Sequence, residues 1–407
     1  MDKQCLERIM KQCSLNETSI SHIENIQYEP AVAKGENYAS VILRYRITVQ
    51  LTNGEKEVKY VIVKTVPECE KEAAFCTETP VFKNEIFMYA VVLKEMEKLM
   101  KEFNDTRDKL WADLVGYRNN DVVMVDDLSR KQFVVMDRRE MLDFEHSQLA
   151  IKALARFHAM SAVLLKRNII KATDFKTLLF VSSEKMINLF FVCFFNTFGD
   201  VVKKHWGSEW SYLPEHLYNA AKSSVERCSN MVKLEKSRFN VINHGDCWTN
   251  NIMFKHRIDN SGNKIPIAIR LIDLQMGHCN SFAWDLTYFF YNSIRPDIRR
   301  SRYFDLLSIY HKTLKEFLGI YSYPMDEIPT LDCVINEMQR LKFFGISLLI
   351  SIQAFTSTEV PDSYDLFLAY ANHQNPASGI NINIFNTESF RNKVEEDLKA
   401  FVKEGII

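Results

Sequence analysis

Residues 241–254 read VINHGDCWTNNIMF, and this segment decides how the rest of the chain is interpreted. Asp246 and Asn251 stand five residues apart, behind a His-Gly pair and before an apolar run. A carboxylate and an amide oxygen at this spacing can lie in one loop and face one point. Each residue alone would most often be an ordinary turn residue, so the pattern is informative only together with further acidic residues.

The residues that follow Asn251 predict a β-hairpin. NIMFKHR and IPIAIRLIDL have the composition of strands, and DNSGNK between them has the composition of a turn. Pairing of the two strands would bring Asp273, at the end of the second, beside Asn251. Asp246, Asn251 and Asp273 would then form an oxygen-rich site of the kind that Mg²⁺ prefers, with waters and phosphates completing it.

A second hairpin is predicted between residues 33 and 66. SVILRYRITVQL and VKYVIVKTV flank the turn signal TNG. Because side chains alternate along a strand, Tyr60, Ile62 and Lys64 would share one face and Val61 and Val63 the other. A lysine on a buried strand needs a partner or a ligand.

A helix is predicted next, with Thr79 as N-cap and Pro80 as the first helical residue. Its apolar positions follow a 3.6-residue period: Phe82, Ile86, Tyr89, Leu93, Met96 and Met100. Glu85 lies on the apolar flank of this helix and also needs a partner. We therefore expect a Lys64–Glu85 ion pair; the alternative is a surface pair worth about 0–1 kcal/mol.

The length of 407 residues suggests two or three lobes. A short strand is predicted at 121–128 and a long helix at 146–166, followed by an aromatic-rich helical region to about residue 235; the final ~120 residues also have helical spacing. We predict an α+β fold with a β-rich N-terminal lobe (1–122), a hinge (123–129) and an α-rich C-terminal lobe (130–407).

Composition narrows the class of protein. The net charge of -1 offers no electrostatic footprint for nucleic acid or an anionic membrane. Nine cysteines, an odd number without a CxxC pair, favour reduced thiols over a zinc site or a disulfide framework. The N-terminus lacks a signal-peptide apolar core, and the apolar stretches 187–195 and 343–352 are short of the ~20 residues of a membrane span. We expect a cytoplasmic protein.

The pattern HGDCWTNN followed by LIDLQ resembles the catalytic segment H-R-D-x-x-x-x-N and the strand-end Asp of protein kinases. HGD-x-W-x-x-N with a following DxQ is similar to the aminoglycoside/choline kinase branch of the protein-kinase-like fold. It is more similar still to the insect ecdysteroid kinase-like (CHK kinase-like) family. Further matches cover most of the chain in the order of the family: GENYAS, VIVKT, FKNEIFMY, MVDDL, LARFHA and FAWDLTYFF.

This resemblance implies a bilobal protein-kinase-like fold that uses ATP and Mg²⁺. Lys64, held by Glu85, would position the α/β-phosphates of ATP, while Asn251 and Asp273 would hold Mg²⁺. Asp246 would orient the acceptor hydroxyl and take its proton. Four more residues are assigned to nucleotide binding: Tyr38 and Ser40 at the phosphates, and Met124 and Asp126 at the adenine-binding hinge.

Other residues receive supporting roles. His244 belongs to the catalytic loop, where we expect it to hold the loop by hydrogen bonding and not to act as a base. Asp285 would tie down the same loop, and His158 is expected to be a satisfied histidine between helices. Trp248 would either pack the loop or stack near the acceptor.

The resemblance implies an ecdysteroid-like alcohol as acceptor, with xenobiotic or other small alcohols as the alternative. Six residues could wall an apolar pocket or belong to the core, the second being favoured: Phe190, Phe191, Phe194, Phe195, Phe343 and Phe344. A protein kinase is disfavoured because Asp273 is followed by Leu274 and Gln275 and not by Phe-Gly. A catalytically dead ligand carrier is the rival from another class. The expected partner is a small-molecule hydroxyl substrate, without nucleic acid or a membrane span, and the oligomeric state is open.

Overall fold

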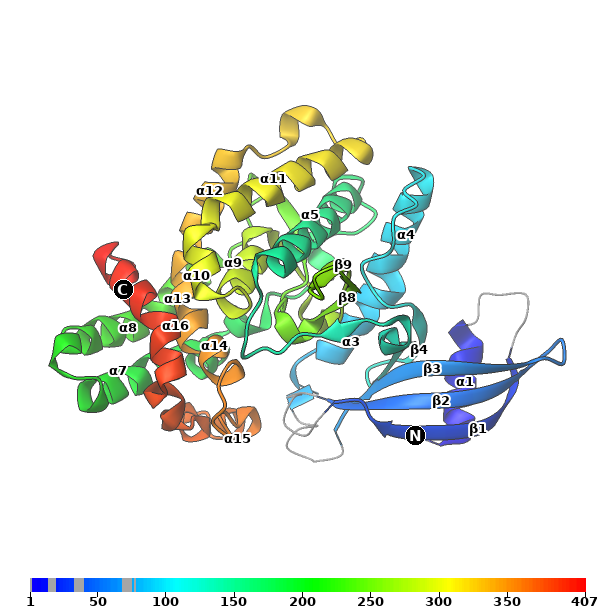
Figure 1. Cartoon of the computed structure of the whole chain (residues 1–407), viewed down its shortest axis with the longest axis horizontal. Helices are drawn as coiled ribbons and strands as arrows, with labels where there is room; N and C mark the ends of the chain where they lie inside the picture. Colours follow the sequence, from blue (N-terminus) through cyan, green and yellow to red (C-terminus); the bar gives the residue numbers. More distant parts are fainter. Residues whose placement is uncertain (1, 14–19, 33–39, 68–74, 77) are drawn as a thin grey trace.

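The computed structural model describes residues 2–13, 20–32, 40–67, 75–76 and 78–407. The chain forms a β-rich N-terminal lobe and a larger helical C-terminal lobe (Figure 1). The sheet lies at the lower right of Figure 1, and most of the C-terminal helices lie on the opposite side. The predicted two-lobed α+β architecture is therefore confirmed.

The N-terminal lobe contains, within the described residues, a five-stranded antiparallel sheet in the order β1-β2-β3-β5-β4. Its strands are β1 (Ile20–Pro30), β2 (Val41–Leu51), β3 (Lys56–Thr65), β4 (Leu114–Arg118) and β5 (Val122–Asp126). The predicted β2–β3 hairpin is present. Helix α1 (Lys3–Cys13) packs apolar side chains against the face that holds Val61 and Val63, which leaves Ile62 and Lys64 on the other face.

The predicted helix after β3 is present, but it starts later and is interrupted. It consists of α3 (Val81–Phe87), the π-helical turn η1 (Met88–Val92) and α4 (Leu93–Glu102). Its six predicted core positions are all buried. The predicted N-cap is wrong: Pro80 occupies the N-cap position without a side-chain capping bond, and the Thr79 hydroxyl donates to the carbonyl of Phe75 (2.6 Å).

The chain leaves the sheet at the end of β5, which pairs with both β3 and β4. It then forms the 3-10 turn η2 (Leu128–Lys131) and the short strand β6 (Val134–Val135). Residues 122–126 thus belong to the sheet, and the crossing to the C-terminal lobe begins at Asp127. The lobe boundaries proposed from sequence remain a prediction.

The C-terminal lobe is built around α5 (Phe144–Lys166), which packs against α11 (Tyr303–Ile320). The other helices are α6 (Glu184–Ile187), η5 (Asn188–Val192), α7 (Cys193–His205), α8 (Leu213–Met231), α9 (Ala283–Asn292), α10 (Pro296–Ser301), α12 (Leu331–Arg340), α13 (Lys342–Ile350), α14 (Ile352–Thr356), α15 (Leu366–Ala371) and α16 (Glu388–Lys403). The helical character predicted for this region is confirmed.

Two small sheets of this lobe carry the segment 241–254, which contains Asp246 and Asn251. β7 (Asn240–Asn243) pairs with β10 (His278–Ser281). After the 3-10 turn η7 (Thr249–Asn251), β8 (Ile252–Ile258) pairs with β9 (Lys264–Leu271), so the predicted second hairpin is confirmed. The turn η8 (Leu274–Met276) follows Asp273.

Two helical segments are long and apolar enough, by length and composition, to cross a membrane: Phe144–Lys166 and Glu184–His205. Their most apolar windows are 78% and 72% buried inside the protein. Burial of this extent is typical of helices in the core of a folded lobe. The apolar stretches at 187–195 and 343–352 are likewise buried, as predicted.

A buried ion pair fixes the last helix. Both guanidinium nitrogens of Arg299 (α10) bond the carboxylate oxygens of Asp397 (α16) at 2.7 and 2.9 Å, and both residues are buried. Removing one partner of such a pair leaves an uncompensated buried charge, which costs about 3–5 kcal/mol.

We therefore predict that Asp397→Ala lowers the free energy of unfolding by about 3–5 kcal/mol, measured by urea unfolding. The neighbouring Glu396→Ala is the matched control, because its pair with Lys399 is exposed and should leave the unfolding midpoint nearly unchanged. Equal midpoints for the two variants would show that the buried pair does not anchor α16.

Candidate active site

The loop between β7 and η7 is held by one buried carboxylate. The backbone N–H groups of His244 and Gly245 donate to the two oxygens of Asp285 at 2.6 and 2.7 Å. Burial raises the pKa of Asp285, but the hydrogen bonds from His158 and from the backbone N–H of Gly245 are among the interactions that outweigh it, so the pKa lies below its ordinary value. His158 also contacts Tyr310 of α11 at 2.9 Å, so the predicted histidine between helices is found there.

His244 is used at both ring nitrogens. Nε2 faces the carbonyl oxygen of Ile272 at 2.9 Å and must donate, because a carbonyl only accepts. Nδ1 accepts from the backbone N–H of Asp246 at 3.3 Å. Burial lowers the pKa of His244, which favours this neutral form. These contacts fit the predicted loop-holding role and leave neither nitrogen to act as a base.

Asp246 is fixed by two side-chain donors. The hydroxyl of Tyr288 donates to Oδ1 at 2.5 Å, and Nδ2 of Asn251 donates to Oδ2 at 2.9 Å. Burial and the negative charge of Asp273 raise the pKa of Asp246 to about 7. Tyr288 was not predicted as a site residue, although it stands three residues after Asp285 in the motif FAWDLTYFF, about one turn along the same helix.

Lys64 joins the two lobes. Its ammonium lies 2.8 Å from Oε2 of Glu85 in α3 and 2.5 Å from Oδ1 of Asp273, and it donates to Oε1 of Gln275 at 3.1 Å. The predicted contact of Lys64 with Glu85 is present, and both side chains are buried. Burial lowers the pKa of Lys64, but the two carboxylates more than reverse this effect, so the ammonium stays charged.

A cavity of about 1140 Å³, including the part open to solvent, lies between the lobes and is called the inter-lobe cavity. Lys64, Glu85 and Asp273 line one part of it. The remainder includes Arg44, Asp126, Asp127 and Ser129 as well as apolar walls from both lobes: Val32, Ile42, Ile62, Ala112, Val125, Leu128, Phe133, Met253 and Ile272. A flat apolar ring would fit between such walls, with charged groups directed at the Lys64 part.

The predicted nucleotide-binding residues differ in their position relative to the inter-lobe cavity. Asp126 lines the inter-lobe cavity, and Ser40 directly precedes β2, whose Ile42 lines it. The side chain of Met124 is fully buried in the sheet core and its backbone pairs with strands on both sides, so it is not part of the cavity lining, and its assignment to adenine stays a prediction. It lies inside the sheet because it occupies a central strand. Tyr38 lies outside the described residues.

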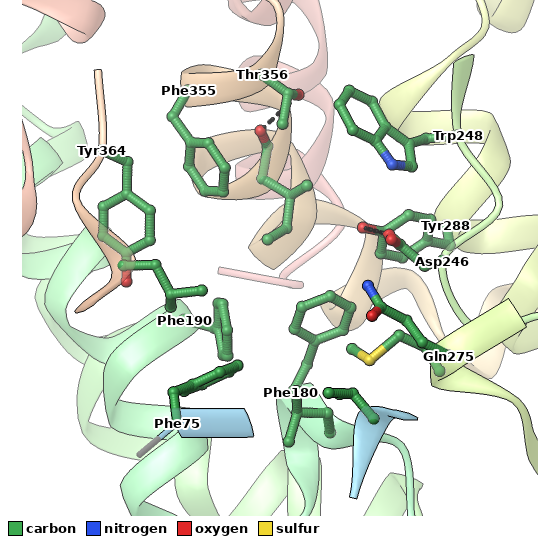
Figure 2. A pocket seen from close by; sticks show the side chains of 15 residues that line it. Phe75, Phe180, Phe190, Asp246, Trp248, Gln275, Tyr288, Phe355, Thr356 and Tyr364 are labelled. Carbon is green, nitrogen blue, oxygen red and sulfur yellow. Dashed lines mark hydrogen bonds between the residues drawn. The ribbon is translucent and has the colours of Figure 1, made fainter. Parts of the chain in front are cut away.

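A second cavity, of about 650 Å³, is lined by Asp246 and is called the Asp246 cavity (Figure 2). Figure 2 shows Asp246, Trp248, Gln275 and Tyr288 on one side of it and aromatic rings around the other. Its fifteen lining residues are Phe75, Val81, Leu179, Phe180, Phe190, Asp246, Trp248, Gln275, Met276, Tyr288, Ile352, Phe355, Thr356, Tyr364 and Leu366. Asp246 is the charged residue of this lining.

The aromatic residues considered from sequence are split by the fold. Phe190 lines the Asp246 cavity, whereas Phe191, Phe194, Phe195, Phe343 and Phe344 are buried away from it. Trp248 lines the cavity, so it stands beside Asp246 and does not only pack the loop. Sequence spacing does not separate these positions, because π-helical and α-helical turns alternate along residues 184–205.

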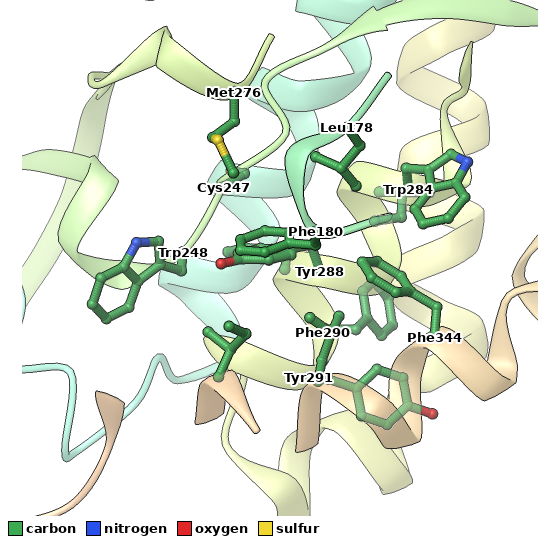
Figure 3. Close-up of a cluster of buried hydrophobic side chains, with 14 of the residues drawn as sticks. Leu178, Phe180, Cys247, Trp248, Met276, Trp284, Tyr288, Phe290, Tyr291 and Phe344 are labelled. Atoms are coloured by element: carbon green, nitrogen blue, oxygen red, sulfur yellow. The ribbon is translucent and has the colours of Figure 1, made fainter. Parts of the chain in front are cut away.

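An aromatic cluster supports the cavity floor (Figure 3). The rings of Tyr288 and Phe180 stack at 5.7 Å with an interplanar angle of 12°, and Trp284 packs against Phe344 at 4.6 Å. Stacking fixes the ring that carries the hydroxyl next to Asp246. Aromatic pairs of this kind add about 0.5–1.5 kcal/mol beyond their burial.

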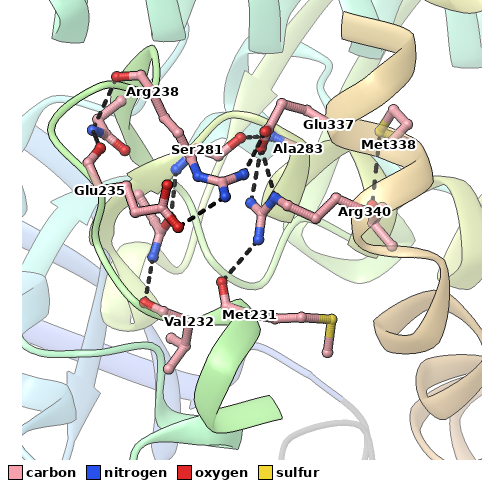
Figure 4. Close-up of polar contacts among 12 residues, drawn as sticks. Met231, Val232, Glu235, Arg238, Ser281, Ala283, Glu337, Met338 and Arg340 are labelled. Carbon is pink, nitrogen blue, oxygen red and sulfur yellow. Dashed lines mark hydrogen bonds and ion pairs between the residues drawn. The ribbon is translucent and has the colours of Figure 1, made fainter. Parts of the chain in front are cut away.

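A polar network surrounds the β7–β10 pair and involves residues of α8 and α12 (Figure 4). Glu337 of α12 bonds Arg238 at 2.6 Å and Arg340 at 2.8 Å, and Arg340 donates to the carbonyl of Met231 at the end of α8. Asn280 of β10 donates to the nearby carbonyl of Val232 at 2.9 Å. The network thus connects the end of α8, β10 and α12 next to β7, the strand that leads into His244.

The residues predicted to hold Mg²⁺ lie beside each other, since the N–H of Ile272 donates to the carbonyl of Asn251 at 3.0 Å. Nδ2 of Asn251 is bonded to Asp246, which leaves the amide oxygen to face a cation. Asp273 lines the inter-lobe cavity in a left-handed backbone conformation (φ 61°). Within the described residues no three His, Cys, Asp or Glu side chains form a metal cluster. An amide oxygen and one carboxylate suit a cation that takes its other ligands from water and a nucleotide.

The model of the ecdysteroid kinase-like family matches residues 34–323. The chain belongs to the ecdysteroid kinase-like family. This confirms the family resemblance and the protein-kinase-like fold, and it supports a phosphotransferase that acts on a small molecule. Among curated proteins, none matches the chain. One solved structure, described as the microcompartment-associated aminopropanol kinase, is 10% identical with a TM-score of 0.38, over 86% of this chain and 96% of that chain.

The backbone of Gly245 generates a prediction. Its φ is +85°, and a Cβ there would stand 2.1 Å from the carbonyl oxygen of Met276. Gly245→Ala must therefore displace the loop that carries Asp246, and displacements of about 1 Å can cost about 10²-fold in rate. We expect phosphotransfer by Gly245→Ala to fall by about that factor, measured as ATP consumption with acceptor.

Gly54→Ala is the matched control for this variant. Gly54 also has a positive φ (+88°), but a Cβ there meets nothing within 4 Å. Gly54→Ala should cost only about 1–2 kcal/mol of stability from backbone strain and keep its turnover. Normal turnover by a folded Gly245→Ala would contradict the tight packing of the loop.

Proposed function

We propose that the protein transfers the γ-phosphoryl group of ATP to a hydroxyl of a small apolar alcohol. The observation that carries the proposal is the position of Asp246. It lines an apolar cavity, and its hydrogen-bond partner Asn251 is bonded through its backbone to Ile272, next to Asp273, which lines the charged part of the inter-lobe cavity.

ATP is proposed to lie in the inter-lobe cavity. Its adenine would fit between the apolar walls, near the segment from Asp126 to Ser129, and its phosphates would extend towards Lys64. Glu85 holds Lys64 from the side of α3, so the ammonium is kept in place before the nucleotide arrives. The predicted phosphate contacts of Ser40 and Tyr38 remain part of this proposal.

Mg²⁺ is proposed to bind Asn251 and Asp273. When bound, it neutralises charge on the phosphates in the transition state. Lys64 contacts Oδ1 of Asp273 at 2.5 Å, which leaves further lone pairs of the carboxylate for a cation. The chain's own contribution is to hold the two oxygen donors side by side through the β8–β9 register.

Asp246 is proposed to orient the acceptor hydroxyl and to take its proton as the oxygen attacks the γ-phosphorus. Tyr288 and Asn251 hold the carboxylate in one orientation, and each of its oxygens keeps capacity to accept a further hydrogen bond. Positioning and charge stabilisation supply most of the rate in phosphoryl transfer.

The lining of the Asp246 cavity supports an apolar acceptor. Phe75, Phe180, Phe190, Trp248 and Phe355 form much of its wall. We propose an ecdysteroid or a similar apolar alcohol as the substrate. The second candidate is a xenobiotic alcohol, since the same wall accepts other apolar rings. A cytoplasmic location is part of the proposal and rests on the cysteine pattern alone.

Variants of the two aspartates test the mechanism. Asp246→Ala should abolish turnover while Mg·ATP still binds, because Lys64 and Asp273 are untouched. Asp273→Ala should also weaken Mg·ATP binding, since a proposed metal ligand is lost. The measurements are ATP consumption and the shift of melting temperature with Mg·ATP, which reports binding to the folded state.

The acceptor is tested with a panel of ecdysteroids, other sterols, choline and drug-like alcohols, with Asp246→Ala as the blank. Near-normal turnover by Asp246→Ala would remove its assigned role. Turnover only with non-steroid alcohols would favour the xenobiotic candidate. A protein that consumes ATP with no alcohol of the panel would overturn the proposed kinase activity, and absence of Mg·ATP binding as well would favour a ligand carrier.

Phe190 and Phe191 provide a matched test of the acceptor site. Both are buried on the same π-helical turn, but only Phe190 lines the Asp246 cavity. Phe190→Leu should raise the acceptor KM several-fold and leave Mg·ATP binding unchanged. The ring of Phe191 packs against Phe344. Phe191→Leu should therefore change the stability of the protein without changing the acceptor KM. Equal KM effects would place the acceptor elsewhere.

A further inference from the structure

Gln275 is a residue of the LIDLQ motif to which the proposed mechanism assigns no role. It lies on η8, two residues after Asp273. Its backbone is fixed from the N-terminal lobe: Nδ2 of Asn84 in α3 donates to the carbonyls of Gln275 and Gly277, both at 2.8 Å. The position of the Gln275 side chain is therefore set by both lobes.

The side-chain amide of Gln275 contacts two groups of the inter-lobe cavity. Its Oε1 accepts from Lys64 at 3.1 Å, and its Nε2 donates to Oδ2 of Asp273 at 3.3 Å. A glutamine amide offers two N–H donors and two oxygen lone pairs. Each end of the amide has thus made one bond and can make a second.

The same side chain lines the Asp246 cavity and not the inter-lobe cavity. Figure 2 shows the amide beside Asp246, with its polar end directed into the cavity. Two hydroxyl groups of the lining direct their protons elsewhere: the Tyr288 hydroxyl donates to Asp246, and the Thr356 hydroxyl donates to the carbonyl of Ile352. Gln275 is the uncharged polar side chain of this wall that also bonds Lys64 and Asp273.

We propose that Gln275 is an acceptor-positioning residue: its free N–H donates to the oxygen of the acceptor hydroxyl while its other bonds hold it to Lys64 and Asp273. This inference rests on the proposed function. A hydroxyl has one proton and two lone pairs. Its proton is directed at Asp246, one lone pair accepts from Gln275, and the other faces the γ-phosphorus.

The proposed contact does not alter which covalent bonds form and break in the reaction. The bond from the acceptor oxygen to the γ-phosphorus forms, the bond from that phosphorus to the leaving oxygen of ADP breaks, and the proton goes to Asp246. Gln275 contributes orientation alone. Because one amide touches the acceptor, Lys64 and Asp273, it holds the acceptor in register with the phosphate side of the site.

The test compares Gln275→Ala and Gln275→Glu with the parent protein. The acceptor probe is whichever alcohol of the panel the parent phosphorylates. Both variants lose the N–H donor, so kcat/KM for the acceptor should fall about tenfold or more. The Kd for Mg·ATP should change less than threefold in Gln275→Ala, because Lys64 keeps Glu85. A residue that only supports the fold would not produce this separation of acceptor and nucleotide effects.

Gln148→Ala is the matched control. Gln148 also accepts from a lysine, Lys152, at 3.1 Å, but it does so on the exposed surface of α5. It should behave as the parent in both measurements. The inference is overturned if Gln275→Ala keeps the parent's acceptor kcat/KM, or if its Mg·ATP affinity falls as much as its acceptor kcat/KM. A parent that phosphorylates no alcohol of the panel overturns the proposed function, and the inference with it, before any variant is compared.

Discussion

The buried ammonium of Lys64 is the constraint on which the rest of the site depends. It lies between two carboxylates from different parts of the fold: Glu85 on the N-terminal helix α3, and Asp273 at the end of β9 in the C-terminal lobe. A lone charge at this depth would be prohibitively costly. The lobes therefore have to meet so that a strand, a helix and a hairpin end converge on one point.

A second fixed point lies behind the first. Asp285 receives the N–H groups of His244 and Gly245, and this holds the loop that carries Asp246. The left-handed backbone of Gly245 lets the loop pass directly over the carbonyl of Met276. Asp246 is then oriented by Tyr288 from the same helix as Asp285. Asp285, which holds the loop, and Tyr288, which orients Asp246, are thus about one helical turn apart on α9.

The hydrogen bonds of Gln275 connect the linings of the two cavities, which differ in character. The inter-lobe cavity combines apolar walls with a concentrated group of charges, whereas the Asp246 cavity is aromatic and carries one carboxylate. The difference fits a charged nucleotide on one side and an apolar partner on the other. Gln275 stands at the boundary, since its amide bonds to the charges of the first cavity and its side chain lines the second.

The sequence by itself determined the two-lobed α+β fold, the two hairpins, and the pairing of Lys64 with Glu85. It could do so because strand alternation, turn residues and helical periodicity are local, and because a buried charge demands an opposite one. The tertiary structure alone decided the rest. Tyr288 reaches Asp246 and Phe190 lines the cavity through the packing of helices distant in sequence, and Met124 is enclosed by strands on both sides. The Thr79 hydroxyl donates to the carbonyl of Phe75 instead of capping α3, a contact that the local capping pattern does not reveal.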